Sequence, residues 1–278
     1  MRYVGLVLVA VAVLLSLAAS SPAGSTGHKL PDLVPIPKYL KDRRIETSGS
    51  QKLLRFSNGV GNYGAGALEV AGSRASTSDQ MTATQRVYLT GGGFADMTIG
   101  TFIYDPAHGH WHFDDFAKYE LLDGNGAVVA SNEKAGFCLL DVERIKPPLA
   151  GAPNQPAYST CNQGNASARS IGPQGISVGW TDIYRKYLEN QYIDITGVPA
   201  GSYTLRVTAD PLDKIDEANE GKNMTSVQVT VLVPPAWTMF GSETASSAVL
   251  YLPSGPAMRM LWGSAPSLPR SKVTSCPV

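Results

Sequence analysis

The sequence lacks the features that would place it at once in several common protein classes. It has only 3 cysteines in 278 residues and no CxxC pair, which excludes a disulfide-dense scaffold and argues against a zinc ribbon or a thioredoxin-like site. Its 23 Lys and Arg balance 23 Asp and Glu without a basic stripe, so the attraction that phosphate-backbone binding requires is missing. We therefore expect no nucleic-acid partner. Its 43% of hydrophobic residues still predict a globular body.

Long apolar runs are also lacking, with one exception at the N-terminus. Residues 1–24 combine Met-Arg-Tyr, an apolar run from Val4 to Leu17 and a group of small residues, which is the pattern of a cleaved secretory signal peptide. The run is shorter than the roughly 20 residues that a spanning helix needs. A retained N-terminal anchor is the alternative. Either route delivers the body outside the cytoplasm, so we expect a secreted, extracellular protein with no membrane span in the mature chain, in which disulfides are permitted.

Short runs of alternating apolar and polar residues fill the body of the chain. A period of two is typical of half-buried strands, and the runs are bounded by Gly, Asn, Asp and Pro. They are Lys52–Phe56, Met97–Tyr104, Tyr119–Leu122, Ala127–Ala130, Tyr192–Ile195, Tyr203–Ala209 and Ser226–Val233. Asp-Gly-Asn-Gly at 123–126 predicts a hairpin, and only 181–191 could form a short helix. The sequence predicts an all-β fold, an antiparallel β-sandwich with long loops and little helix.

Two segments do not fit the strand pattern. Residues 145–175 are rich in Pro, Gly, Asn, Ser and Gln, which predicts a long surface loop. Residues 234–278 form a Pro-, Ser- and Ala-rich tail with few strand signals, and Cys276 within it has no obvious partner.

Histidine is scarce, yet it is concentrated. Three of the 4 histidines, His108, His110 and His112, fall within five residues. In an extended segment these positions share one face, with Cα steps of about 6.5 Å, while Gly109 and Trp111 face the other way. Three imidazoles suit zinc, copper, iron or nickel and leave a coordination position open for water, oxygen or substrate. The pattern predicts a catalytic metal centre.

Other interpretations of this cluster stay open. An exposed histidine strand that binds metal adventitiously is the simplest alternative. Asp114 and Asp115 follow the cluster and could supply a fourth ligand, an acceptor that orients an imidazole, or solvated charges at a strand end. The residues do not choose the metal, although the Irving–Williams order favours copper.

Several segments resemble, in order along the chain, the lysyl oxidase family. They are His-Gly-His-Trp-His at 108–112, Lys-Ala-Gly-Phe-Cys at 134–138, Asp-Ile-Tyr at 182–184, Ile-Asp-Ile-Thr at 193–196 and, at the start, Pro-Asp-Leu-Val-Pro at 31–35. The matches span about residues 31–230, and their co-occurrence is much more specific than any one of them.

The resemblance implies a catalytic domain over residues 30–233 that acts as a copper amine oxidase. His108, His110 and His112 would hold copper, and Lys134 and Tyr184 occupy the positions of the two residues that the family joins into lysyl tyrosylquinone. This quinone would condense with a primary amine, either peptidyl lysine or a small amine, and release an aldehyde, while molecular oxygen is consumed and ammonia and hydrogen peroxide form.

The resemblance leaves some residue roles open. Tyr187 and Tyr192 are alternatives to Tyr184 if the alignment slips. Lys118 stands where the animal enzymes have a histidine, which leaves the general base unassigned, with Asp114 or Asp115 as candidates.

The cysteines also depart from the family. The animal enzymes carry several more of them, whereas here only Cys138 and Cys161 lie in the body, on either side of the long loop. We predict that these two pair and leave Cys276 over.

A calcium site is a further candidate. The family's calcium site uses a loop that corresponds to residues 213–223 together with the start of the domain, and a cluster of carboxylate and amide oxygens suits a hard cation. The positions that map onto its ligands are Asp32, Leu33 through its carbonyl, Glu217, Asn219 and Asn223. Lys222 replaces one family ligand, and a solvated acidic turn is the alternative.

The sequence thus predicts a secreted copper amine oxidase that resembles lysyl oxidase. Two other functions fit the same residues. One is a mononuclear metal enzyme that uses the histidines without a quinone, and the other is a non-catalytic metal-binding surface module.

Overall fold

The structure is a computed structural model that describes residues 27–76, 78–134, 136–161 and 164–232, without the side chains of residues 133 and 134. These residues belong to a unit that ends at Val233, and a second unit comprises Pro234–Val278. The expected signal peptide at 1–24, the expected tail and Cys276 all lie outside the described residues. No helix among the described residues is long and apolar enough to cross a membrane.

The described chain is built almost entirely of strands. The strands are β1 (His28–Lys29), β2 (Leu33–Pro35), β3 (Arg43–Ser48), β4 (Gln51–Phe56), β5 (Asn58–Asn62), β6 (Leu68–Ser73), β7 (Gln80–Leu89), β8 (Phe94–Asp105), β9 (His110–Phe113), β10 (Ala117–Leu122), β11 (Val128–Lys134), β12 (Glu143–Arg144), β13 (Ser170–Ile176), β14 (Trp180–Tyr184), β15 (Tyr192–Asp194), β16 (Gly201–Ala209) and β17 (Met224–Val231). The helical elements are the short α1 (Pro37–Leu40) and the 3-10 turn η1 (Glu220–Lys222). This confirms the predicted all-β class with little helix.

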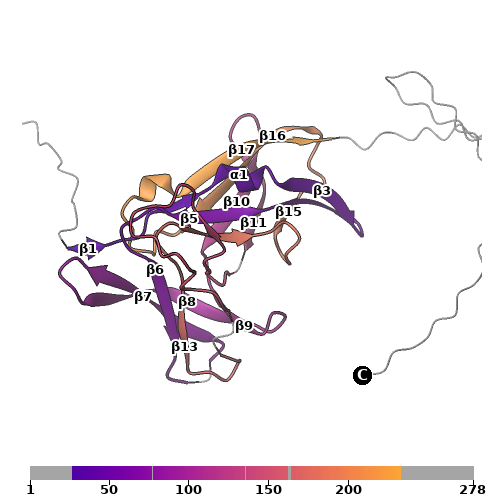
Figure 1. Cartoon of the computed structure of the whole chain (residues 1–278). Coiled ribbons are helices and arrows are strands. Elements are labelled where there is room, and N and C mark those ends of the chain that lie inside the picture. Colours follow the sequence, from indigo (N-terminus) through magenta and orange to yellow (C-terminus); the bar gives the residue numbers. More distant parts are fainter. Residues whose placement is uncertain (1–26, 77, 135, 162–163, 233–278) are drawn as a thin grey trace, which may run out of the picture. The chain divides into compact units, whose positions relative to one another are not determined.

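The strands form several antiparallel sheets (Figure 1). The largest has the order β13-β6-β7-β8-β9, with β1 paired to β7. Two four-stranded sheets follow the orders β11-β10-β16-β17 and β12-β14-β5-β2, and a three-stranded sheet has the order β15-β4-β3. The largest sheet ends in β9, which carries two of the three clustered histidines.

Alternation along the strands builds one hydrophobic core. In β16, Tyr203, Leu205 and Val207 are buried, while the residues between them are partly exposed. The same alternation operates in β9, where Trp111 and Phe113 are buried and the neighbouring histidines face outward. Core packing of β9 therefore fixes the face on which the imidazoles project.

The predicted hairpin at residues 123–126 is confirmed. The Asp123 carboxylate accepts hydrogen bonds from the amides of Asn125 and Ala127, each at 2.9 Å, and Gly126 adopts a φ of 83° that favours glycine. The turn joins β10 to β11, and β11 ends at Lys134.

Two predictions about irregular segments are wrong. The suggested helix over 181–191 is strand β14 followed by turns, because β14 is hydrogen-bonded to β5 on one side and β12 on the other. Such two-sided pairing outweighs local helix preference. The long loop ends earlier than expected, since β13 begins at Ser170 and pairs with β6. β13 is a strand because it pairs with β6, although its sequence contains Gly and Pro and shows no regular alternation.

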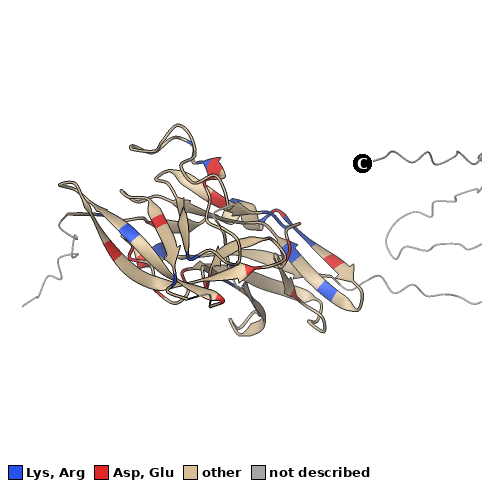
Figure 2. Ribbon diagram, turned by 90° about the horizontal axis from the view of Figure 1, so that it is seen from below, with Lys and Arg blue, Asp and Glu red and all other residues tan. Residues whose placement is uncertain are grey.

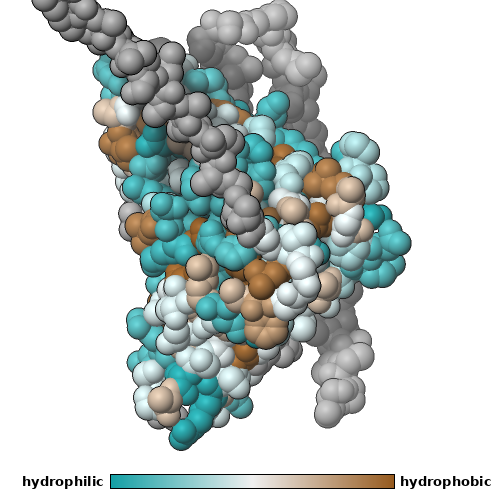
Figure 3. Space-filling view, turned by 90° about the vertical axis from the view of Figure 1, so that its left-hand side faces the viewer, coloured by the Kyte–Doolittle hydropathy of each residue, from teal (hydrophilic) through white to brown (hydrophobic). Residues whose placement is uncertain are grey.

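Acidic and basic residues are interspersed along the ribbon in Figure 2, and neither sign forms a stripe on the strands seen there. Apolar residues are scattered among polar ones on the face seen in Figure 3. Both views agree with the balanced composition.

The core makes a direct stability prediction. Leu205 is 0% exposed in the middle of β16, so Leu205→Ala should lower the free energy of unfolding by about 2–5 kcal/mol. Leu212→Ala is the matched control, because Leu212 is 56% exposed and its change should stay within about 0.5 kcal/mol. Chemical denaturation of both variants measures the difference; equal losses would contradict the assignment of Leu205 to the core.

Candidate active site

A hairpin at the end of the largest sheet positions the three histidines. β8 and β9 pair through Asp105 and His110, and the turn between them is closed by a hydrogen bond from the Gly109 amide to the Asp105 carbonyl at 2.8 Å. His110 and His112 lie in β9, whereas His108 lies in the turn. The expectation of one extended segment therefore holds for two of the three histidines. His108 reaches the cluster because the turn folds back over the strand.

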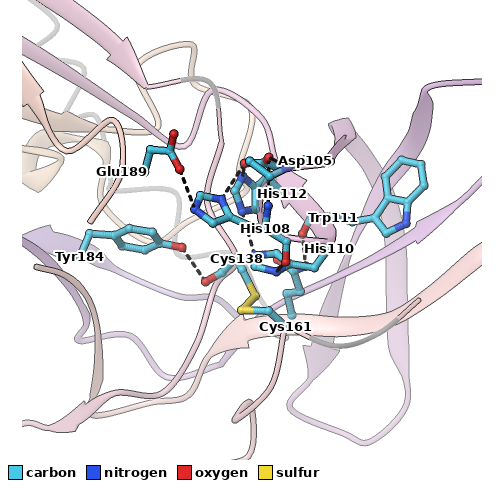
Figure 4. A network of polar contacts seen from close by, with 11 residues as sticks. Asp105, His108, His110, Trp111, His112, Cys138, Cys161, Tyr184 and Glu189 are labelled. Atoms are coloured by element: carbon cyan, nitrogen blue, oxygen red, sulfur yellow. Dashed lines mark hydrogen bonds and ion pairs between the residues drawn. A yellow bond between two sulfur atoms is a disulfide. The ribbon is translucent and has the colours of Figure 1, made fainter. Parts of the chain in front are cut away.

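The three imidazoles converge in space. One ring nitrogen from each of His108, His110 and His112 lies within 4.8 Å of the others, and the Nε2 atoms of His110 and His112 are 2.9 Å apart (Figure 4). His108 is exposed and the other two are half-buried. Burial lowers the pKa of His110, which favours the neutral form that binds metals. The donor set fits a transition-metal ion with solvent access.

Two carboxylates that sequence reasoning missed lie beside the imidazoles. Asp105 Oδ2 is 2.7 Å from His108 Nδ1 and 3.5 Å from His112 Nδ1. Glu189 Oε2 is 3.6 Å from His108 Nε2. Burial alone would raise the pKa of Asp105, but hydrogen bonds from His108 and the Ala107 amide outweigh it and hold this pKa below its ordinary value.

Asp105 thus has the geometry of a residue that orients metal ligands. A carboxylate that accepts the Nδ1 proton of an imidazole fixes the ring and leaves its Nε2 available as a donor. The sequence signal was present, because Asp105 precedes His108 by three residues across a Pro-containing turn. Glu189 gave no such signal, since it follows Tyr184 in a segment that only the fold brings to His108.

The predicted disulfide is confirmed and lies next to the histidines. Cys138 and Cys161 are bonded, with a Cα–Cα distance of 5.8 Å. Both sulfurs lie within 4.8 Å of a ring nitrogen of His110 (Figure 4). The disulfide is therefore part of the wall of the candidate site as well as a tie across the loop.

Cys138 lies between Tyr184 and the histidines in Figure 4. Its hydroxyl donates a hydrogen bond to the Cys138 carbonyl at 2.8 Å, and its ring packs edge-on against Phe137 at 4.4 Å. Burial, and after it the charge of Asp182, raises the pKa of Tyr184 well above its ordinary value. Figure 4 shows the phenol directed toward Cys138, with the histidines beyond it.

The alternatives to Tyr184 are placed differently. Tyr187 is 71% exposed in the turn after β14. Tyr192 begins β15, opposite Arg55 of β4. Tyr184, by contrast, is hydrogen-bonded to Cys138 and packs against Phe137.

Lys134 is described by its backbone alone. It ends β11 and pairs with Ala117 of β10. It precedes Cys138 by four residues, so their Cα atoms are at most about 14 Å apart. Lys134 therefore lies only four residues in sequence from Cys138, whose carbonyl accepts the hydrogen bond of the Tyr184 hydroxyl.

The candidate general bases are held in other contacts. Asp115, whose φ is 58°, forms an ion pair with Lys214 at 2.8 Å. Burial, together with the charge of Asp115, raises the pKa of Asp114. Lys118, which stands at the family's histidine position, pairs with Glu120 at 3.2 Å.

A separate acidic cluster forms around η1. Carboxylate oxygens of Asp210, Glu217 and Glu220 lie within 4.8 Å of one another. The Asn223 side-chain amide donates to Glu217 at 2.6 Å and to Glu220 at 2.8 Å. Burial raises the pKa of Glu217 to about 8 and that of Glu220 to about 7, and nearby carboxylates reinforce both shifts. The raised pKa values indicate that neighbouring positive groups do not fully balance the negative charge of these carboxylates.

The fold brings together part of the predicted calcium set. Glu217 accepts a hydrogen bond from the Leu33 amide at 2.7 Å, and Asp32 is bound by Lys222 at 2.6 Å. Asp32 Oδ1 and Asn223 Oδ1 are buried without a hydrogen-bond partner among the described residues. The Asn219 side chain caps η1 by accepting a hydrogen bond from the Gly221 amide at 3.1 Å.

Asp105 supplies a test of how the histidines are held. Asp105→Ala should weaken Co²⁺ or Cu²⁺ binding by about 10–100-fold, since the carboxylate no longer orients His108 and His112. Asp96→Ala is the control in the same strand, because Asp96 pairs with Arg86 on the exposed part of β8. Competition with a chelator measures both affinities. Unchanged affinity in Asp105→Ala would show that the carboxylate does not orient the ligands.

The chain is similar to known proteins over the segment that contains these residues. A family model described as lysyl oxidase matches residues 88–238, which include the histidines, Lys134, both bonded cysteines and Tyr184. Lysyl oxidase homolog 2 of Gallus gallus is 31% identical over 179 residues, covering 64% of this chain and 18% of that protein. Lysyl oxidase homolog 3B of Danio rerio is 29% identical over 179 residues, covering 63% of this chain and 17% of that protein.

The aligned part of this chain therefore covers less than a fifth of the full length of each of these relatives. The family match itself covers more than half of the 278 residues and contains every residue of the histidine cluster and its surroundings. This match shows that the chain belongs to the lysyl oxidase family.

Proposed function

We propose that this protein is a secreted copper amine oxidase that converts the primary amine of peptidyl lysine or a small amine into an aldehyde. The observation that carries the proposal is the convergence of three histidine nitrogens beside the segment that anchors Tyr184. Family membership supports amine oxidation as the chemistry. The net reaction consumes the amine, oxygen and water and yields the aldehyde, ammonia and hydrogen peroxide.

His108, His110 and His112 would hold the copper. The Nε2 atoms of His110 and His112 are 2.9 Å apart, so both could bind the same ion. Imidazole ligands suit copper, and family membership favours it over the other metals that they suit. When bound, copper supplies one-electron chemistry with oxygen.

Lys134 and Tyr184 would provide the organic cofactor, lysyl tyrosylquinone, by joining the lysine amine to the oxidised tyrosine ring. The cofactor supplies a carbonyl that captures primary amines. Within this chain, the Cys138 carbonyl orients the Tyr184 hydroxyl, and Phe137 shields the ring from water. Asp105 holds His108 and His112 in place, and Glu189 adds negative charge at the exposed side.

Secretion is part of the same proposal. The N-terminal 24 residues have the signal-peptide pattern, and the disulfide belongs to an oxidising compartment.

We also propose that the acidic cluster binds calcium. In support, Asn223 is hydrogen-bonded to Glu217, Asp32 precedes Leu33, whose amide donates to Glu217, and the buried oxygens Asp32 Oδ1 and Asn223 Oδ1 suit a hard cation. Asp210 and Glu220, which the family pattern did not suggest, would take the place of Asn219. The Lys222 ammonium neutralises Asp32 in part, so calcium would compete with it there.

Peroxide release tests the amine oxidase directly. After aerobic copper loading, the full chain should release hydrogen peroxide with a diamine substrate, and His110→Ala, Tyr184→Phe and Lys134→Arg should each abolish it. Tyr187→Phe and Lys118→Arg are matched controls that should keep most of the activity, because they leave the proposed cofactor intact. Activity that survives Tyr184→Phe would rule out this tyrosine as the cofactor residue.

Mass spectrometry separates the proposal from its rivals. A cross-linked peptide pair containing Lys134 and Tyr184 should appear after copper loading in air and be missing in Lys134→Arg. Peroxide release without the cross-link would favour a metal enzyme that lacks the quinone. Neither cross-link nor peroxide in a folded, copper-loaded chain would favour a non-catalytic metal-binding module.

The acidic cluster predicts a pH-dependent stability. The folded-state pKa of Glu217, about 8, lies above its ordinary value of 4.5, so folding favours the protonated form. Its stabilising contribution is complete below about pH 4.5 and is lost as the pH rises through 8. The Tm should therefore fall between pH 5 and pH 8 more in the wild type than in Glu217→Gln, and Ca²⁺ should restore more of it at pH 8 in the wild type.

Asp79→Asn, which removes an exposed carboxylate outside the cluster, is the control and should follow the wild type. Identical pH profiles in Glu217→Gln and the wild type would contradict the assigned role of Glu217. A lack of any Ca²⁺ effect would contradict the calcium proposal alone.

A further inference from the structure

The Cys138–Cys161 disulfide lies beside the histidine cluster. Both sulfurs and one ring nitrogen of His110 lie within 4.8 Å of one another, and so does one ring nitrogen from each of the three histidines. His110 is the residue common to the two groups. Two thiolates and an imidazole are a ligand set that suits zinc and cuprous copper, and opening the disulfide would supply the two thiolates.

We propose that the reduced chain binds a thiophilic metal ion between Cys138, Cys161 and His110, and that closure of the disulfide returns His110 to the histidine triad. The second part rests on the proposed role of the triad as a metal site. The first part does not, because its ligands are defined by the cysteines.

The geometry allows the cysteines to share an ion. Two thiolates about 2.3 Å from a tetrahedral ion are about 3.8 Å apart, so the sulfurs must separate from bonding distance to that value. The Cα–Cα distance of 5.8 Å is compatible with this opening by side-chain rotation. Cys138 is buried and its carbonyl is bound by Tyr184, whereas Cys161 is half-buried in a loop. We therefore assign the movement to Cys161.

His110 can serve only one of the two sites at a time. Its Nδ1 lies 3.0 Å from the His108 carbonyl, which cannot donate, so this nitrogen carries the proton in the hydrogen bond. Nε2 is then the single free lone pair of His110, and it faces Nε2 of His112 at 2.9 Å. A metal ion on the cysteines that takes this lone pair removes it from the triad, so the two sites compete for His110.

Oxidation of the cysteines would therefore transfer the metal between sites. Thiol–disulfide exchange with a disulfide oxidant, such as oxidised glutathione, removes two electrons from the two thiolates and forms the Cys138–Cys161 bond. The oxidant takes up these electrons and two protons and becomes two thiols. The metal ion keeps its charge, loses its two sulfur ligands and retains His110, with His108 and His112 as the new partners.

Cobalt(II) is a suitable probe, because thiolate ligands give it an intense near-ultraviolet charge-transfer band that nitrogen ligands do not give. The experiment uses the full chain with Cys276→Ser, reduced under anaerobic conditions and freed of reductant. One equivalent of Co²⁺ should produce the thiolate band. Oxidised glutathione should then abolish the band while Co²⁺ stays bound to the protein.

Three variants define the ligands. Cys161→Ser should lose the band and weaken Co²⁺ binding to the reduced chain by more than about tenfold, since a direct ligand matters at least as much as an orienting one. His110→Ala should weaken both the reduced and the oxidised site. His108→Ala is the matched control: its reduced chain should bind Co²⁺ as the wild type does, and oxidation should release the ion.

Two results would overturn the proposal. One is Co²⁺ binding to the reduced chain without a thiolate band, or with an affinity that Cys161→Ser leaves unchanged. The other is loss of the near-ultraviolet circular dichroism on reduction, because the site needs the fold to bring His110 to the cysteines. Amine oxidation by the oxidised, copper-loaded chain is measured separately, so the failure of this proposal is distinguishable from the failure of the proposed activity.

Discussion

Two backbone hydrogen bonds between Phe113 and Phe137 hold the candidate site together. The Phe113 amide donates to the Phe137 carbonyl at 2.8 Å, and the Phe137 amide donates to the Phe113 carbonyl at 2.9 Å. Phe113 directly follows His112, and Phe137 directly precedes Cys138. This bridge therefore joins the strand that carries His110 and His112 to the segment that carries Cys138, whose carbonyl anchors Tyr184.

The core fixes the bridge in place. Phe113 and Phe137 are both fully buried, and their rings pack around Phe116, with Phe137 also contacting Tyr184. Each buried aromatic ring contributes a large apolar area, so a shift of either strand would expose that area to water. The imidazoles on the outer face of β9 and the phenol of Tyr184 are consequently positioned by side chains that take no part in the chemistry. Rigid support of this kind is what a precise site requires.

Much of the fold and part of the site could be predicted from the sequence. Alternation of residue types identified β16 because this strand buries one face, and it also identified β4 and β10, in which consecutive residues are buried. The HxHxH spacing predicted a candidate metal site because the clustering of the histidines is a local property of the sequence. β14 escaped prediction because its strand character comes from pairing with β5 and β12, which the local sequence does not encode. Glu189 escaped for a similar reason, since only the fold brings this segment to His108. Asp105 stands three residues before His108 in the sequence, but its role depends on the turn that brings His108 back to its carboxylate.

Copper-dependent formation of a quinone from Lys134 and Tyr184 is the central claim, and the visible absorption spectrum of the protein tests it most directly. The full chain, purified without metal and then loaded with copper in air, should develop the colour of a quinone, which a carbonyl reagent such as phenylhydrazine then shifts. Lys134→Arg should not develop the same spectrum. A folded chain that binds one copper ion at the histidines and stays free of quinone absorbance would show that Lys134 and Tyr184 do not meet, and would contradict the account.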